Sequence, residues 1–258
     1  MTAQFEQSRL VVGLQPVREV IRVHRNAVLR VAIDARSLPR LDALERFARD
    51  QGVPEVLRVH GQDLDRWSHG VEHQGVMADA PPLEFVDLTD TIVDPKLLAI
   101  ALDQIQDPHN FGAIIRSAVA VAGAAVFFGE HRAAPLSCAT FRASAGAIEH
   151  ARLCRVRSLR QALLEARDVG ANVIGLDAQA TSELSELPLV GPTVLVVGSE
   201  HEGLSKGVRH ACSHFGRLPS SGQLDSLNAS VAAGIALAIA AVQRRAKQKL
   251  EEPPRGAS

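Results

Sequence analysis

The stretch "LLAIALDQIQDPHNFGAIIRSAVAVAGAAVFF", from Leu97 to Phe128, combines two apolar segments with a helical pattern between them. The segments 97–102 and 124–128 are short and wholly apolar, which is typical of strands buried on both faces. Between them, 111–121 has apolar residues at helical spacing, so that one side of a helix is buried. This order predicts two parallel strands joined by a helix.

The same alternation of apolar strands and helices continues toward the end of the chain. Apolar strands are expected at 172–176 and 193–197, and helices at 158–168 and 227–249. Short apolar strands that alternate with helices predict an α/β fold with a parallel sheet covered on both faces.

The first third of the chain reads as a smaller α/β unit. "RLVVGLQPVREVIRV" predicts a short strand, a turn and a helix, and 28–35 predicts a strand. A helix over 38–52 ends at Gly52, "PEVLRVH" predicts a further strand, and Pro81-Pro82 breaks the pattern. The expected organisation is an N-terminal domain over 1–77, a linker over 78–91, a second domain over 92–250 and a disordered tail over 251–258.

Composition indicates a soluble globular protein. The 258 residues are 46% hydrophobic with a net charge of −1, and the cations are 24 arginines and four lysines. Aromatic residues make up 3% and tyrosine is absent, which argues against an aromatic base-stacking platform. The opening sequence does not resemble a signal peptide, and the apolar run 230–242 is short for a membrane span. Three cysteines without a CxxC pair favour a cytoplasmic protein without a disulfide framework or zinc site.

Three loops that follow predicted strands carry unusual polar residues. In the first, "DPHNFGAIIRSA", Asn110 is placed to cap the helix and Arg116 lies beside its buried stripe. Ligands of open α/β sheets bind at the carboxyl ends of the strands. Arg116 could therefore face a ligand, or it could extend along the surface or pair with a carboxylate.

The second loop, "VLVVGSEHEGLSKG" (194–207), contains two glycines around Glu200 and Glu202. It lacks the Lys-Ser/Thr that a Walker A loop carries after its last glycine, and it is not a GxGxxG motif. Its carboxylates would repel a triphosphate but suit a cationic ligand. An ordinary glycine-rich connection is the alternative.

The third loop lies within "LPSSGQLDSLNASVAAGIALAIAAVQRR" (218–245) and leads into a helix rich in small apolar residues. Ser226 is placed to cap that helix, and Asn228 would lie in its first turn. Simple capping is the alternative for each of them.

These three segments resemble the three ordered motifs of the SpoU (TrmH) family of RNA ribose 2′-O-methyltransferases, in the SPOUT superfamily. The segments "VVGLQPVREVI", "HQGVMA" and "FRASAGAIEH" also resemble that family's 23S rRNA guanosine methyltransferases, so that the resemblance covers residues 9–245. It implies a knotted parallel-sheet catalytic domain, preceded by a small α/β RNA-binding domain of the ribosomal protein L30e type. It also implies S-adenosylmethionine as methyl donor, S-adenosylhomocysteine as product, a homodimer, and no metal.

The resemblance assigns roles to particular residues. Catalytic positions match Asn110, Arg116, Glu200, Ser226 and Asn228. Cofactor contacts match Leu176, Gly198, Ser199, Glu200, Leu218, Leu227 and Asn228. The third motif usually opens Ile-Pro-Met, whereas this chain has Leu218-Pro219-Ser220, so that an apolar wall near the cofactor is lost. RNA is expected to bind the N-terminal domain through Arg18, Arg22, Arg25 and Arg30.

The resulting prediction is an enzyme that methylates a ribose 2′-hydroxyl, with a guanosine of 23S rRNA as target. The N-terminal domain favours rRNA over tRNA, because the tRNA enzymes of the family lack such a domain. Two alternatives remain: the same chemistry on tRNA guanosine or rRNA adenosine, as in antibiotic-resistance members, and a non-catalytic ribosome-binding protein with a methyltransferase fold.

Overall fold

The computed structural model describes residues 8–200, 202–220 and 226–251. The chain divides into two compact units, which are described separately. The first comprises the residues up to Glu84 together with Phe111–Arg116 and Pro135–His150. The second comprises Phe85–Asn110, Ser117–Ala134 and the chain from Ala151 onward. Of the predicted tail, 251–258, only Glu251 is among the described residues, where it ends a helix.

The second unit is built on a six-stranded sheet in the order β10-β8-β9-β5-β6-β7, with every neighbouring pair parallel. The strands are β5 (Leu98–Leu102), β6 (Ala125–Gly129), β7 (Leu153–Val156), β8 (Asn172–Leu176), β9 (Thr193–Val197) and β10 (His214–Gly216). The parallel α/β fold is thus confirmed. The deep knot stays a prediction, because strand order alone does not show how the chain is threaded.

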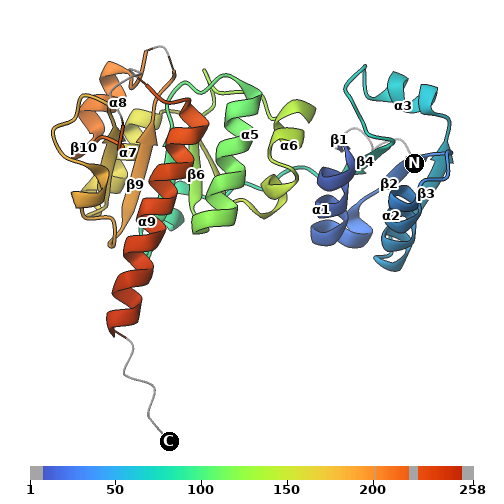
Figure 1. Ribbon diagram of the computed structural model, residues 1–258, viewed down its shortest axis with the longest axis horizontal. Helices are drawn as coiled ribbons and strands as arrows, with labels where there is room; N and C mark the ends of the chain where they lie inside the picture. Colours follow the sequence, from blue (N-terminus) through green and yellow to red (C-terminus); the bar gives the residue numbers. More distant parts are fainter. Residues whose placement is uncertain (1–7, 201, 221–225, 252–258) are drawn as a thin grey trace, which may run out of the picture. The chain divides into compact units, whose positions relative to one another are not determined.

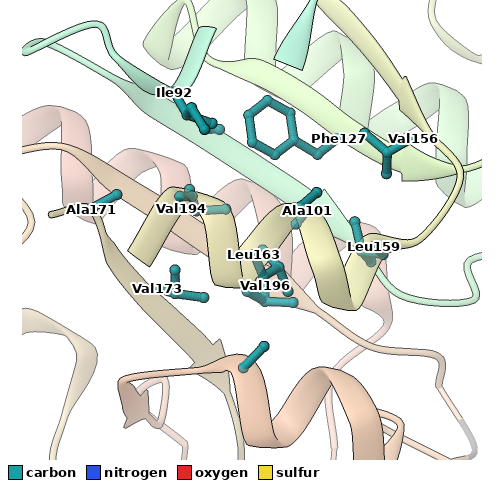
Figure 2. Close-up of a cluster of buried hydrophobic side chains, with 14 of the residues drawn as sticks. Ile92, Ala101, Phe127, Val156, Leu159, Leu163, Ala171, Val173, Val194 and Val196 are labelled. Atoms are coloured by element: carbon teal, nitrogen blue, oxygen red, sulfur yellow. The ribbon is translucent and has the colours of Figure 1, made fainter. Parts of the chain in front are cut away.

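Apolar side chains cover both faces of this sheet. On one face, Ala101 of β5, Val194 of β9 and Phe127 of β6 join Leu163 of α7 (Leu159–Asp168) in one buried cluster (Figure 2). Alternation along β5 directs Leu98, Ile100 and Leu102 to the opposite face. The remaining helices of this unit are α4 (Leu88–Ile92), the π-helical turn η3 (Ala118–Ala122), η5 (Leu184–Glu186), α8 (Lys206–Ala211) and α9 (Ala229–Glu251).

Helix α9 passes over β9 and contacts η3 (Figure 1). It is the one helix in the described part of the chain that is long and apolar enough to cross a membrane by length and composition, and 33% of that apolar window is buried within the fold. At the far end of α9, Arg244 is half-buried and donates to the backbone carbonyls of Leu189 (2.8 Å), Lys96 (2.9 Å), Leu97 (2.7 Å) and Gly191. This guanidinium fastens α9 to the segments that enter β5 and β9.

The first unit contains a mixed sheet in the order β1-β4-β2-β3, in which only β2 and β3 are parallel. Its elements are β1 (Arg9–Val12), α1 (Leu14–His24), η2 (Arg25–Ala27), β2 (Arg30–Asp34), α2 (Pro39–Asp50), β3 (Glu55–Val59), α3 (Gly61–Trp67) and β4 (Val76–Ala80). No strand was predicted at β4, which extends into the predicted linker, 78–91, as does α4. The domain boundaries therefore stay a prediction.

The remaining elements of the first unit are α6 (Cys138–Ala143), which packs on the middle of α5 (Pro108–Ser117), and η4 (Ala147–His150), which contacts α1. A Cβ on Gly112 of α5 would lie 2.6 Å from both the Ala143 Cβ and the Thr140 carbonyl oxygen. Glycine therefore allows α5 and α6 to approach closely.

A buried carboxylate joins η4 to the start of the chain. Glu149, whose side chain is 1% exposed, accepts two hydrogen bonds from Arg9, one of them at 2.9 Å, and one from the His24 Nε2 at 2.9 Å. Burial raises the pKa of Glu149, but the hydrogen bonds from His24 and Arg9 outweigh it, so that the pKa lies below its ordinary value. The charged form of Glu149 therefore stabilises the folded unit.

Glu149→Gln is expected to lower the thermal midpoint at pH 7, because Arg9 loses its buried counter-charge, at a cost of about 3 kcal/mol. The folded-state pKa of Glu149 is lowered, so its stabilisation is complete above an unfolded pKa of about 4.3 and fades as the pH falls through the folded-state value. Melting curves of both proteins from pH 7 to pH 3 should thus converge in acid. A difference in midpoint that stays constant with pH would contradict this assignment.

Candidate active site

The helix that carries the first motif begins earlier than its sequence suggests. Helix α5 starts at Pro108, and the Asp107 carboxylate accepts from the backbone N–H groups of His109 (3.1 Å) and Asn110 (3.2 Å). The prediction that Asn110 caps the helix is therefore wrong. Because Asp107 satisfies these donors, the Asn110 side chain is left to make other contacts.

In the third motif, too, the helix start and its capping residue differ from the prediction. Helix α9 begins at Ala229, and the Asn228 Oδ1 accepts from the N–H groups of Ser230 (2.9 Å) and Val231 (3.3 Å). Asn228 is therefore the cap, and the prediction of Ser226 in this role is wrong. Ser226 is exposed, two residues before the cap.

Side chains from all three motifs meet at the carboxyl edge of the sheet. The Asn110 Nδ2 donates to the Glu200 Oε1 at 2.9 Å, and the Asn228 Nδ2 donates to the Asn110 Oδ1 at 3.0 Å and to the same Glu200 oxygen. The Ala229 N–H also points to that oxygen, at 3.3 Å. We call Asn110, Glu200 and Asn228 the motif triad. Each member fixes the orientation of the others.

Arg116 is not part of the motif triad. It lies six residues after Asn110 on α5, which turns its side chain about 120° away around the helix axis. Arg116 is exposed and makes no hydrogen bond or ion pair with any residue in the described ranges. Its guanidinium is therefore free to meet an external group.

The loop of the second motif depends on a glycine. Ser199 and Gly203 exchange backbone hydrogen bonds of 3.1 and 2.9 Å, which fold the chain back upon itself after β9. A Cβ on Gly198 would lie 2.2 Å from the carbonyl carbon and oxygen of Gly203 and 2.5 Å from the Leu204 nitrogen. Only glycine fits there without displacing the backbone of the loop.

The predicted cofactor positions lie beside one another on the same edge. Strand register pairs Gly216 of β10 with Leu176, and Gly175 with Val196 of β9, so that Leu218, Leu176 and Gly198 lie at or just after the ends of three adjacent strands. Within the described residues, Gly198 and Leu218 make no backbone hydrogen bond. Leu227, directly before the triad residue Asn228, is 40% exposed. Ser220 is exposed after Leu218.

One residue of this region is not identified by sequence reasoning. Asp103 is 5% exposed at the end of β5, and its Oδ2 accepts from the Ser205 N–H at 2.6 Å. Its own N–H donates to the Val197 carbonyl at 2.8 Å. Asp103 thus ties the far end of the second-motif loop to the strand that leads to the first motif. The sequence feature that could have identified Asp103 is a carboxylate directly after a buried strand.

The buried cysteines of this unit are poor nucleophiles. Burial raises the pKa of Cys154 to about 11 and that of Cys212 to about 12, so both thiols are protonated at neutral pH. No group of three His, Cys, Asp or Glu residues positioned to hold a metal occurs among residues 8–200, 202–220 and 226–251.

The predicted RNA-binding arginines all lie in the first unit. Arg18, Arg22 and Arg25 are exposed along α1 and at its end; Arg18 lies over Phe47 and Arg22 pairs with Glu19 at 2.9 Å. Arg30 is half-buried between Asp79, at 2.7 Å, and the Trp67 ring. Arg30 is thus held within the fold, and the other three form a solvent-facing stripe.

Family comparisons cover nearly the whole chain. Residues 97–238 match the SpoU rRNA Methylase family, and residues 10–86 match the family described as RNA 2′-O ribose methyltransferase substrate binding. An uncharacterized tRNA/rRNA methyltransferase of Mycolicibacterium smegmatis is 39% identical over 246 residues, which cover 93% of this chain and 78% of that protein.

Solved structures of this family are similar to the chain in fold. The SpoU methyltransferase AviRb from Streptomyces viridochromogenes, in complex with AdoMet, is 25% identical with a TM-score of 0.76 over 93% of this chain and 92% of its own. The TrmH/SpoU tRNA modifying enzyme of A. aeolicus is 28% identical with a TM-score of 0.52, over 66% of this chain and 88% of its own. With its three motifs joined at one sheet edge and both family matches in order, the chain belongs to the SpoU rRNA methylase family.

Proposed function

We propose that this chain transfers the methyl group of S-adenosylmethionine to a ribose 2′-hydroxyl of RNA, and that its target is a guanosine of 23S rRNA in the cytosol. The motif triad carries the proposal, because it joins side chains of all three motifs at the edge where α/β sheets bind ligands. The family match supports the class of reaction. The match of residues 10–86 to a substrate-binding domain supports RNA as the partner.

The proposed cofactor fits the chemistry of this edge. S-adenosylmethionine has an adenine edge that needs backbone donors and acceptors, and no phosphate that needs a phosphate loop. Gly198 and Leu218 offer backbone groups without partners in the described chain, and Leu176 and Leu227 flank them. When bound, the cofactor would supply an electrophilic methyl group on a sulfonium. The carboxylate of Glu200 suits a cationic ligand, and Ser199 holds the loop in place.

The chain's residues would act mainly by alignment. A guanidinium does not lose its proton at neutral pH, so Arg116 would grip the target phosphate and stabilise the developing alkoxide, while the proton leaves to phosphate or water. Glu200 holds Asn110, whose amide would position the ribose. Asn228 and Ser226 would fix the substrate and cofactor sides. Holding the ribose in place against the bound cofactor would supply most of the rate enhancement.

The proposal includes a homodimer. Helix α9 carries exposed apolar side chains at Val231 (49%), Ile235 (36%) and Val242 (65%), which recur along one side of the helix. Exposed apolar stripes of this kind mark association surfaces, and a second copy would cover this one.

A labelling experiment tests the function. The purified chain is incubated with methyl-labelled S-adenosylmethionine and unmodified 23S rRNA or bulk tRNA, and the RNA is digested to nucleosides. We expect label in 2′-O-methylguanosine from rRNA. Label on a base would contradict the reaction, and label in tRNA or in 2′-O-methyladenosine would change the substrate. Absence of cofactor binding in calorimetry would support the non-catalytic alternative.

A further inference from the structure

We propose that Arg132, Arg157 and Arg160 form a docking row for the phosphate backbone of the RNA substrate, on the β6–β7 side of the catalytic sheet. We call these three residues the arginine row. The inference rests on the function proposed above and adds a second set of RNA contacts, separate from the α1 arginines of the first unit.

The arginine row follows the ends of two adjacent strands. Arg132 lies in the loop after β6, Arg157 directly follows β7, and Arg160 lies in the first turn of α7. The Glu130 N–H donates to the Val156 carbonyl at 2.9 Å, so the two strand ends leave the sheet side by side. All three arginines therefore lie at the carboxyl edge that holds the motif triad.

Short contacts connect these segments to the site. The Ala134 N–H, at the end of the β6 loop, donates to the Ile105 carbonyl at 2.8 Å, in the segment that leads to Asn110. A Cβ on Gly207, in the first turn of α8, would lie 3.2 Å from the Arg160 Cδ. The start of α8 is in turn held by Asp103 through Ser205. The arginine row thus borders the first and second motif loops.

The charge of the row is not neutralised. All three side chains are exposed, and none forms an ion pair with a residue in the described part of the chain. Three carboxylates, Asp107, Glu130 and Glu202, are exposed on the same edge. They reduce the positive potential without pairing with the row.

On the β8–β10 side of the same edge, arginines are paired with carboxylates. There, Arg209 pairs with Asp177 at 2.6 Å and Arg217 with Glu183 at 3.7 Å. This is also the side where Leu176, Gly198 and Leu218 offer backbone groups to the cofactor. A polyanion would therefore bind the β6–β7 side, where guanidinium groups can contact phosphates through paired hydrogen bonds.

Alanine variants of each arginine test the inference, with Arg167→Ala as the matched control. Arg167 is an exposed arginine of the same helix as Arg160, but it lies in the last turn of α7, at the opposite edge of the sheet. Binding of purified 23S rRNA, and separately of bulk tRNA, is measured from 50 to 300 mM salt. Calorimetry with S-adenosylmethionine and a melting curve show whether each variant is folded and binds cofactor.

We expect each row variant to bind RNA about 3- to 10-fold more weakly at low salt, and the slope of log K against log salt to fall by about 0.7 to 0.9 per lost contact. Arg167→Ala should match the wild type, and cofactor binding should not change. If the row variants bound RNA with the affinity and the salt slope of the wild type, the inference would be overturned and the proposed function would stay intact. If the wild type bound cofactor but neither RNA, the proposed function and the inference would both fail.

Discussion

Arg116→Ala is expected to lower kcat for methyl transfer by about 100- to 1,000-fold, the cost of removing a charge that stabilises a developing oxyanion. Binding of S-adenosylmethionine should stay within about twofold of the wild type, because Arg116 makes no hydrogen bond or ion pair with any residue in the described part of the chain. Since the side chain is exposed and has no partner in the described chain, the change should cost less than about 0.5 kcal/mol of stability.

Two further variants make this test specific. Arg116→Lys keeps the charge but loses paired hydrogen bonding, so it should retain an intermediate rate. Arg245→Ala removes an exposed arginine from α9 and should leave turnover unchanged. Turnover near the wild-type value in Arg116→Ala, measured by label transfer to the RNA substrate, would show that Arg116 has no role at the reacting oxygen.

Gly198→Ala is expected to weaken S-adenosylmethionine binding by at least about tenfold, equivalent to about 1.4 kcal/mol. The added methyl group would collide with the backbone of Gly203 and Leu204, so the second-motif loop has to move and carries Glu200 with it. Isothermal calorimetry measures the change directly. Methyl transfer should fall in parallel.

Two further glycine variants separate the loss of cofactor binding from general destabilisation of the fold. Gly203→Ala has open space for its methyl group but a φ of 64°, so it should cost about 1–2 kcal/mol in local strain and weaken binding less. Gly191→Ala has open space and no positive φ, and it should bind cofactor normally. Wild-type affinity in a folded Gly198→Ala protein would mean that the loop backbone does not contact the cofactor.

The sequence predicts the sheet well where strands are wholly apolar. The segments 172–176 and 193–197 coincide with β8 and β9, because the four consecutive apolar or small residues that follow Asn172 and Thr193 allow few other structures. β10 was missed, since a three-residue strand with an exposed histidine carries no such pattern. β4 was missed because Asp79 interrupts its apolar run; that carboxylate is compensated by Arg30, a contact across the sheet.

The sequence identified the residues of the motif triad but not the hydrogen bonds between them. Asn110 and Asn228 were both taken to serve as caps or first-turn residues, and local sequence could not show that Asp107 would cap α5 instead. The bonds that unite the motif triad join residues 90 and 118 positions apart. Such bonds depend on strand order and side-chain rotamers, which hydrophobic periodicity does not specify.

The anchoring of α9 by Arg244 also constrains the length of the helix. Asn228 reaches the motif triad at one edge of the sheet, and Arg244 reaches four carbonyls near the other edge, about 24 Å along the axis. Inserting or deleting one residue between them would rotate one end by about 100° and shift it by about 1.5 Å. Only one of the two attachments could then form. The spacing between Asn228 and Arg244 therefore fixes the number of residues in this part of α9, because any change in length breaks one of the two attachments.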